Sequence, residues 1–444
     1  MKRKSLEVTA IGLALAAAAA SAAGENLLQV YRDAQRYDAT YAAARFTLEA
    51  GRERLPQARA GLLPSLNLTA NTMRSNIDSD SRSPAFDYSR SPTSAGYELR
   101  LTQPLYRPQN LADFNSADYQ VKQAEATFAQ ATQDLVVRVV QAYLEVLAAQ
   151  DNLTLVGAQK AAIAEQLAQA KRNFEVGTTT ITDTHEAQSR YDLTVSQEIA
   201  AQNELSNRRQ SLQLITGKEY ARLATLRADV RIPPPNPDQM QAWVELAEKQ
   251  SYVVLIQEAA AEAAQIAVRR ASSGHLPTLD VVATHAQVTE SSTVANSIGR
   301  DVTTSTLGLQ LAVPLFQGGS LTSREREAAA NYNKAREDLQ NARRTAALVA
   351  RQSYVSVING ISQIGALEQA LISSQSALDS NRLGYEVGVR INIDVLNAQQ
   401  QLFTTRRDLF LARYNLINSH LRLRAAAGSL RDEDIEAFNR ALDL

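Results

Sequence analysis

The sequence predicts a mainly α-helical chain with four β-strands, arranged as a tandem structural repeat. Three observations favour this fold class: short motifs recur at a nearly constant offset of 210 to 213, two long runs are almost free of proline, and four short segments alternate apolar with polar residues. A length of 444 residues allows two or three domains, or one large repetitive domain.

The recurring motifs define two copies of one unit. A Leu-Pro pair recurs at an offset of 213, while a Val-Gly pair and a later glycine recur at 211. We therefore divide the chain into a first repeat over 24–231, a stiff Pro-rich linker over 232–238 and a second repeat over 239–444. The matched residues are Leu63-Pro64 and Leu276-Pro277, Val176-Gly177 and Val387-Gly388, and Gly217 and Gly428.

Residues 1–23 are set apart as a secretory signal peptide. A basic start at Lys2 to Lys4 precedes an apolar run at Val8 to Ala20 and small residues ending at Ala23. No later segment has the roughly 18 uninterrupted apolar residues that a transmembrane helix needs, so the exported protein is expected to be soluble or a β-barrel.

Each repeat is expected to open with an Ala-rich helix, over 27–60 in the first copy and 239–271 in the second. Two strands follow in each copy, where residues alternate with a period of two and place apolar side chains on one face. The four predicted strands cover about 65–77, 97–105, 278–288 and 305–315.

Very long helices come next, over about 111–175 and 321–386, and each is followed by a further helix. At 1.5 Å per residue, about 65 residues would extend roughly 100 Å. A heptad of bulky residues near the C-terminus, with small residues at a second position, indicates close coiled-coil packing. The bulky heptad is Val395, Leu402, Leu409, Leu416 and Leu423; the small residues are Ala398, Thr405 and Ala412, matched by Ala187, Thr194 and Ala201 in the first copy.

Four strands are too few to close a barrel within one chain. Two isolated hairpins would leave open edges, which are unfavourable in water and untenable in lipid. Sharing strands among three protomers gives twelve, an even number that is typical of bacterial outer-membrane barrels. The strand count therefore favours a 12-stranded β-barrel that is completed by a homotrimer.

Composition and motifs disfavour other classes of function. Near-equal numbers of basic and acidic residues, 46 and 47, remove the field that a nucleic-acid binder needs. Without cysteine the chain has no disulfides, thiol chemistry, Cys-based zinc site or lipid-modified N-terminal Cys. We expect no catalytic residues, no cofactor and no metal, because no catalytic signature occurs and the histidines have no metal-ligand spacing. These are His185, His275, His285 and His420.

The duplicated layout, the Leu-Pro pairs before the strands and the Pro-Leu-aromatic segments after them resemble the TolC family of outer-membrane export proteins, in its non-lipidated branch. These segments include Pro104-Leu105-Tyr106 and Pro314-Leu315-Phe316. The resemblance implies a homotrimeric channel with a 12-stranded β-barrel in the bacterial outer membrane. It also implies a long α-helical coiled-coil barrel that forms a tunnel extending into the periplasm. It also implies docking to an inner-membrane transporter, ABC or proton-driven, through a periplasmic adaptor (membrane fusion) protein.

Local chemistry concentrates at the two helix-helix turns. One interpretation is helix capping, with Gly177 and Gly388 ending one helix and Thr182 or Asp183 starting the next. The resemblance adds a second role, since the corresponding turns form a closed periplasmic entrance. It implies a gate of Thr182, Asp183, Tyr385 and Arg390.

The entrance departs from the family pattern at one position. The resemblance implies two lumen-facing acids three residues apart; Asp394 matches the first, but Asn397 occupies the second. Three such carboxylates in a trimer, instead of six, predict weaker cation selectivity and weaker block by multivalent cations.

The expected function is a passive exit duct for type I protein secretion, drug efflux or both, because the cargo is not encoded in these motifs. Two alternatives remain open at this point. A periplasmic coiled-coil adaptor also has long helical hairpins, but it would need a lipoyl-like β-domain that the duplicated layout does not contain. An exported enzyme is disfavoured by the missing catalytic constellation.

Overall fold

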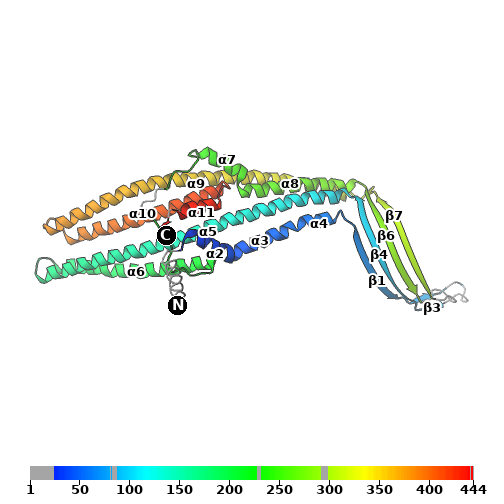
Figure 1. Cartoon of the computed structure of the whole chain (residues 1–444), viewed down its shortest axis with the longest axis horizontal. Helices are drawn as coiled ribbons and strands as arrows, with labels where there is room; N and C mark the ends of the chain where they lie inside the picture. The colour runs from blue at the N-terminus through cyan, green and yellow to red at the C-terminus, as the bar shows by residue number, and fades with distance from the viewer. Residues whose placement is uncertain are drawn as a thin grey trace, which may run out of the picture. The chain divides into compact units, whose positions relative to one another are not determined.

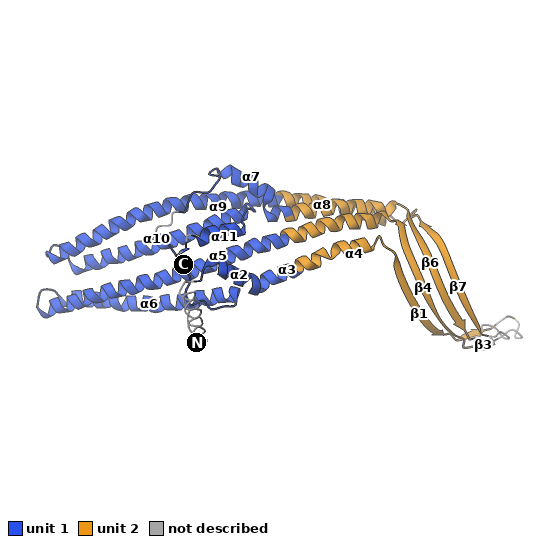
Figure 2. Cartoon of the chain, viewed as in Figure 1, with its two compact units in different colours: residues 1–46, 127–255, 341–444 blue, residues 47–126, 256–340 orange. Residues whose placement is uncertain are grey.

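The computed structural model describes residues 25–80, 82, 88–227, 232–291, 299–440 and 442–443. The predicted signal peptide, 1–23, lies outside these residues. The chain forms two compact units, coloured separately in Figure 2: unit 1 comprises 1–46, 127–255 and 341–444, and unit 2 comprises 47–126 and 256–340. The two longest helices contribute residues to both units.

The two repeats have the same order of main elements, labelled in Figure 1. The first contains α2 (Leu27–Tyr37), α3 (Ala39–Arg52), α4 (Arg54–Ala60), β1 (Ser65–Arg74), β4 (Thr93–Tyr106), α5 (Pro108–Glu175) and α6 (Ile181–Thr216). The second contains α7 (Met240–Gln250), α8 (Tyr252–Ser272), a 3₁₀ turn (Ser273–His275), β6 (Thr278–Glu290), β7 (Arg300–Ala312), α9 (Ser320–Glu386), α10 (Asn392–Ala426) and α11 (Asp432–Asn439). Short strands add β2 (Ile77–Ser79) with β3 (Tyr88–Arg90), and β5 (Thr225–Leu226) with β8 (Leu442–Asp443).

The predicted opening helices are interrupted at matching places. Asp38 separates α2 from α3, and Ser251, at the equivalent position of the second repeat, separates α7 from α8. Both residues have extended ψ angles, 116° and 132°. The Asp38 carboxylate accepts the Tyr41 backbone N–H at 2.7 Å, so it starts a new helix instead of continuing the old one. A second break, at Glu53, divides α3 from α4.

In unit 2 the four main strands form one antiparallel sheet in the order β1-β4-β6-β7 (Figure 1). Its register aligns the predicted apolar positions on one face: Leu66 lies opposite Leu101, Leu101 opposite Ala283, and Ala283 opposite Leu307. The apolar side chains are uncovered, with Leu307 79% and Leu68 67% exposed. The strand bounds differ by a few residues from those expected, because β1 ends at Arg74 and β7 spans 300–312.

Polar contacts stabilise the opposite face and the base of this sheet. Glu98 and Arg100 form an ion pair at 2.9 Å on β4. Where β4 leads into α5, Arg107 binds the buried Asp280 carboxylate through two hydrogen bonds of 2.6 and 2.8 Å. This bidentate pair joins the end of β4 to the start of β6, and thus strands from the two repeats.

In unit 1 the long helices are buried along the predicted stripes. Leu135, Val139 and Tyr143 are fully buried on α5, and every residue of the Val395 to Leu423 heptad is buried on α10. The Tyr143 hydroxyl donates to the Ala224 carbonyl at 2.7 Å, and Tyr354, its counterpart in the second repeat, donates to the Asp238 carbonyl. The same tyrosine in each repeat thus fixes a long helix to the chain that joins the repeats. The helical repeat and its coiled-coil stripes are confirmed.

Candidate functional site at the helical turns

Two turns, α5 to α6 and α9 to α10, carry the predicted site residues, and both lie in unit 1. Gly177 and Gly388 have φ angles of 77° and 78°, the left-handed conformation predicted for residues that end a helix. Behind the first turn, Leu167 and Ala170 of α5 pack against Ala187 of α6. Behind the second, Leu378 of α9 packs against Val395 and Leu402 of α10. Each turn therefore closes a helical hairpin with an apolar interior.

The first turn begins its second helix with a reciprocal cap. The Thr180 hydroxyl accepts the Asp183 backbone N–H, while the Asp183 carboxylate accepts the Thr180 backbone N–H at 3.2 Å. The expectation that Thr182 or Asp183 starts the helix was wrong by two or three residues, because Thr180 is the N-cap and Asp183 is the third helical residue. Thr182 is exposed.

The second turn has no such cap. The N-cap position is occupied by Ile391, whose side chain makes no capping hydrogen bond. Asp394, in the first turn of α10, instead lies 3.6 Å from Arg390 as an i,i+4 ion pair, and the Arg390 side chain is largely exposed. The structure thus brings together the predicted gate arginine and the predicted entrance carboxylate.

The remaining predicted residues contact other partners. Tyr385 accepts a hydrogen bond from the Asn173 side chain at 3.3 Å, and Asn397 accepts one from Arg190 at 2.9 Å. Among the described residues of this single chain, neither Thr182 nor Asp183 has a hydrogen bond to Tyr385 or Arg390. The four-residue gate therefore stays a prediction.

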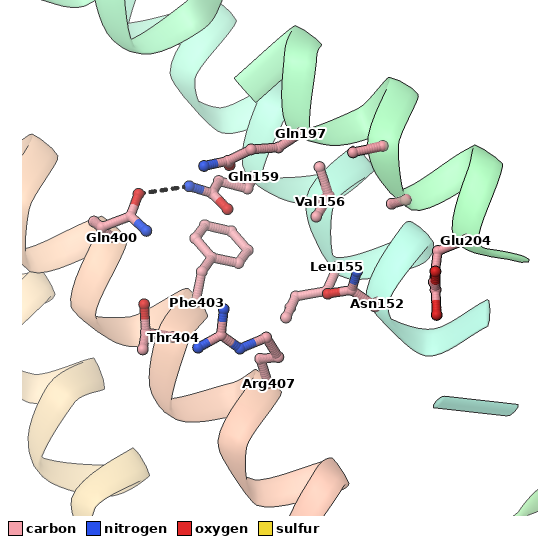
Figure 3. A pocket seen from close by; sticks show the side chains of 12 residues that line it. Asn152, Leu155, Val156, Gln159, Gln197, Glu204, Gln400, Phe403, Thr404 and Arg407 are labelled. Carbon is pink, nitrogen blue, oxygen red and sulfur yellow. Dashed lines mark hydrogen bonds between the residues drawn. The ribbon is translucent and has the colours of Figure 1, made fainter. Parts of the chain in front are cut away.

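Polar contacts farther from the turns also join the α5/α6 hairpin to the α9/α10 hairpin. Gln159 donates to Gln400 at 2.8 Å, the dashed line in Figure 3, and Tyr414 donates to Asp151 at 2.6 Å. Burial raises the pKa of Asp151, and the hydrogen bond from Tyr414 opposes that rise. With Asn173–Tyr385 and Arg190–Asn397 these four pairs form what we term the cross-hairpin contacts.

A cavity of about 420 Å³ lies beside the Gln159–Gln400 pair. Figure 3 shows it between α5, α6 and α10, with Phe403 on one side and Arg407 and Glu204 at its polar margin. The hairpins thus border a partly polar space here, and the Gln159–Gln400 hydrogen bond connects them beside it.

Sequence reasoning did not find Asn173, Arg190, Gln159, Gln400, Asp151 or Tyr414. Their partners are far apart in the chain, for example 207 residues between Arg190 and Asn397. Polar residues on a long helix usually face solvent, and no local pattern distinguishes those that meet a second hairpin. One feature of the sequence could have indicated the Arg190–Asn397 pair: both residues lie within a few helical turns of the predicted entrance.

Within the described parts of the chain, no group of three or more potential ligand side chains is placed to hold a metal ion. None of the helices in these parts of the chain is both long and apolar enough to cross a membrane.

A duplicated pair of helical hairpins with a four-stranded sheet shared by both repeats is the fold of solved outer-membrane channels. VceC from Vibrio cholerae aligns with a TM-score of 0.75 at 19% identity over 90% of this chain and 96% of that one. The CmeC channel of Campylobacter jejuni aligns with a TM-score of 0.77 at 18% identity over 95% and 90%.

The chain belongs to the outer membrane efflux protein family, whose sequence model matches residues 30–218 and 243–429. The two matches are offset from each other by the spacing of the predicted repeat. Outer membrane protein TolC of Vibrio cholerae is 34% identical over 97% of each chain, and the protease secretion protein PrtF of Dickeya chrysanthemi is 32% identical over 98% of this chain and 94% of its own. Family, fold class and outer-membrane location are therefore confirmed, and the chain is an outer-membrane exit duct of a family of channel proteins.

Proposed function

We propose that three copies of this chain join their sheets into a 12-stranded barrel in the outer membrane. The observation that carries the proposal is the sheet itself: β1 and β7 are its two outer strands, and neither has a further partner strand among the described residues. An apolar face that is uncovered along both strands fits contact with lipid acyl chains, whereas in water it would be a large aggregation-prone surface. Joining β7 of one copy to β1 of the next satisfies both edges at once.

The helical hairpins then supply the periplasmic tunnel, and the two turns supply its gated entrance. We propose Thr182, Asp183, Tyr385 and Arg390 as the gate, with Asp394 and Asn397 setting the entrance charge. Tyr385 and Arg390 already take part in contacts at the turns. The hydrogen bond to Tyr385 contributes about 0.5–1.5 kcal/mol and the exposed Arg390–Asp394 pair about 0–1 kcal/mol. A docking partner can supply that much free energy, so the entrance can open reversibly.

The duct would work as a passive conduit without catalysis, with an inner-membrane transporter and a periplasmic adaptor protein as partners. Relatives named for protease secretion support export of proteins, and the efflux name of the family supports a role in efflux as well. Comparing the secreted proteins and the drug sensitivity of a deletion strain with those of its parent distinguishes these cargoes.

Interchain disulfides test the trimer directly, because the natural chain has no cysteine. Within one sheet β1 and β7 are three strand spacings apart, about 14 Å, which is beyond the roughly 7 Å limit between Cα atoms of a disulfide. Asn67→Cys would be combined in turn with Thr304→Cys, Thr306→Cys and Gly308→Cys, all on the polar face. We expect one combination to give a covalent trimer on a non-reducing gel.

The matched control is Thr284→Cys with Thr306→Cys, two residues directly opposite each other on β6 and β7. This pair should close within one chain and leave a monomer band. If all three test pairs stay monomeric in the native membrane while the control forms its bond, the shared barrel is wrong.

A further inference from the structure

We infer that Arg190 is a selectivity-determining residue of the entrance and that its hydrogen bond to Asn397 helps hold the entrance closed. This inference rests on the proposed function, because it assigns a role to a residue pair beside the proposed gate. It adds Arg190 to the site and gives Asn397 a partner.

The contact is a direct bridge between hairpins. The Arg190 guanidinium, on α6, donates to the side-chain oxygen of Asn397, on α10, over 2.9 Å. Arg190 is half-buried, which restricts the positions that its guanidinium group can adopt, whereas Asn397 is exposed. Asn397 lies one helical turn beyond Asp394, so the bridge is beside the ion pair of the second turn.

The charge of this bridge is unbalanced. Asn397 is neutral, and no ion pair with a carboxylate is found for Arg190 among the described residues. Arg390 and Asp394 offset each other at 3.6 Å, so the Asp394 carboxylate is already paired and does not neutralise Arg190. Three copies would place three such cations near the entrance, which disfavours permeation of cations.

The bridge also resists separation of the hairpins. A hydrogen bond from a charged donor is stronger than one between neutral groups, and one between two charged groups is stronger still. Asn397→Asp should therefore tighten the closed state as long as Arg190 is present. Without Arg190, the same carboxylate would be unpaired and would attract cations.

The experiment measures conductance, cation-to-anion permeability and block by a trivalent cation for the purified full chain in planar bilayers. The variants are Arg190→Ala, Asn397→Asp and the double variant. Lys160→Ala is the matched control, because its loss also removes one positive charge. Lys160 pairs with Glu198 between α5 and α6 at 2.5 Å, and among the described residues no hydrogen bond or ion pair joins it to α9 or α10.

We expect Arg190→Ala to raise both conductance and cation preference, the latter by about threefold. Asn397→Asp alone should lower conductance and leave trivalent block weak, whereas the double variant should be blocked strongly. Lys160→Ala should match the parent in conductance. A pore whose conductance and selectivity are unchanged by Arg190→Ala, or one in which Asn397→Asp alone gives strong block, overturns the inference. Failure of the parent chain to conduct at all would instead contradict the proposed function.

Discussion

The turn between α5 and α6 and the turn between α9 and α10 occupy equivalent positions in the two repeats. Each turn carries an aspartate at the matching position, but the two aspartates bind different partners. Asp183 and Asp394 are matching residues of the repeat. Asp183 is committed to a cap with Thr180, whereas the residue matching Thr180 is Ile391, so Asp394 binds Arg390 instead. The first turn is therefore stabilised from within its own helix, and the second depends on a weak exposed pair.

The ends of the repeats show a similar divergence. Gly217 and Gly428 close the last long helix of each repeat, with φ angles of 72° and 67°. A Cβ added at Gly217 would meet the Tyr37 ring, and one added at Gly428 would meet the Gln250 backbone carbonyl. Tyr37 and Gln250 themselves occupy matching positions in the two repeats. Both repeats therefore keep a glycine at this junction. At Gly428 the neighbouring atoms belong to the backbone, which cannot rotate away as the Tyr37 side chain can.

The largest expected effect follows from that junction. Gly428→Ala should lower the free energy of unfolding by about 3 kcal/mol, since a left-handed alanine and a backbone clash add together. Gly217→Ala should cost about 1–2 kcal/mol, because Tyr37 is 61% exposed and can swing aside. Thermal unfolding in detergent, followed by helical circular dichroism, compares the two. Equal losses of unfolding free energy in the two variants would contradict the proposed difference between a side-chain and a backbone clash.

Loosening the second turn should open the entrance. Tyr385→Phe removes the acceptor of Asn173, and Arg390→Ser removes the partner of Asp394, a loss of about 2 kcal/mol per chain. We expect the double variant to raise single-channel conductance in planar bilayers. Ser189→Ala, an exposed change on α6, serves as the control. Conductance equal to that of the parent would remove Tyr385 and Arg390 from the gate.

The helix break of the first repeat carries a titratable residue, Asp38, whereas the matching residue of the second repeat, Ser251, does not titrate. Burial alone would raise the pKa of Asp38, but hydrogen bonds from Arg138 and from the Tyr41 backbone hold it below its usual value. A lowered pKa in the folded state contributes stability that is present above the unfolded value, near 3.9, and is lost as the pH falls through the folded value.

Asp38→Ser, which copies the second junction into the first, should therefore cost about 1–2 kcal/mol at neutral pH by leaving Arg138 without its carboxylate. It should also flatten the loss of stability below about pH 4. Denaturant unfolding at pH 3 and pH 7 measures both effects. A variant with the same acid sensitivity as the parent would show that other carboxylates dominate.

The smallest expected effect comes from exchanging the caps. Thr180→Ala should weaken the start of α6 by about 1 kcal/mol, and Ile391→Thr should strengthen the start of α10 by a similar amount. Amide hydrogen exchange over the first turns of α6 and α10 reports each change locally. The comparison fails if Ile391→Thr leaves exchange at α10 unaltered.

Much of the fold could be predicted because its signals are local or periodic. The 211 and 213 offsets, the alternation in the strands and the Val395 to Leu423 heptad all survive in the structure. The breaks at Asp38 and Ser251 were not predicted, because the Ala-rich segments around them favour one continuous helix. The break at Asp38 comes from a local cap, since its carboxylate accepts the Tyr41 backbone N–H. Thr180 was missed as the cap because Thr182 and Asp183 are equally plausible caps by residue type alone.

The sequence by itself determined the duplication, the order of elements and the faces they bury, because these depend on spacing along the chain. It also placed Tyr385, Arg390 and Asp394 near the turn between α9 and α10. Only the tertiary structure decided the strand order β1-β4-β6-β7 and the partners across the hairpins, Asn173 for Tyr385 and Arg190 for Asn397. Such pairs join residues from different repeats, and their selection depends on how the helices pack and not on any pattern within one helix.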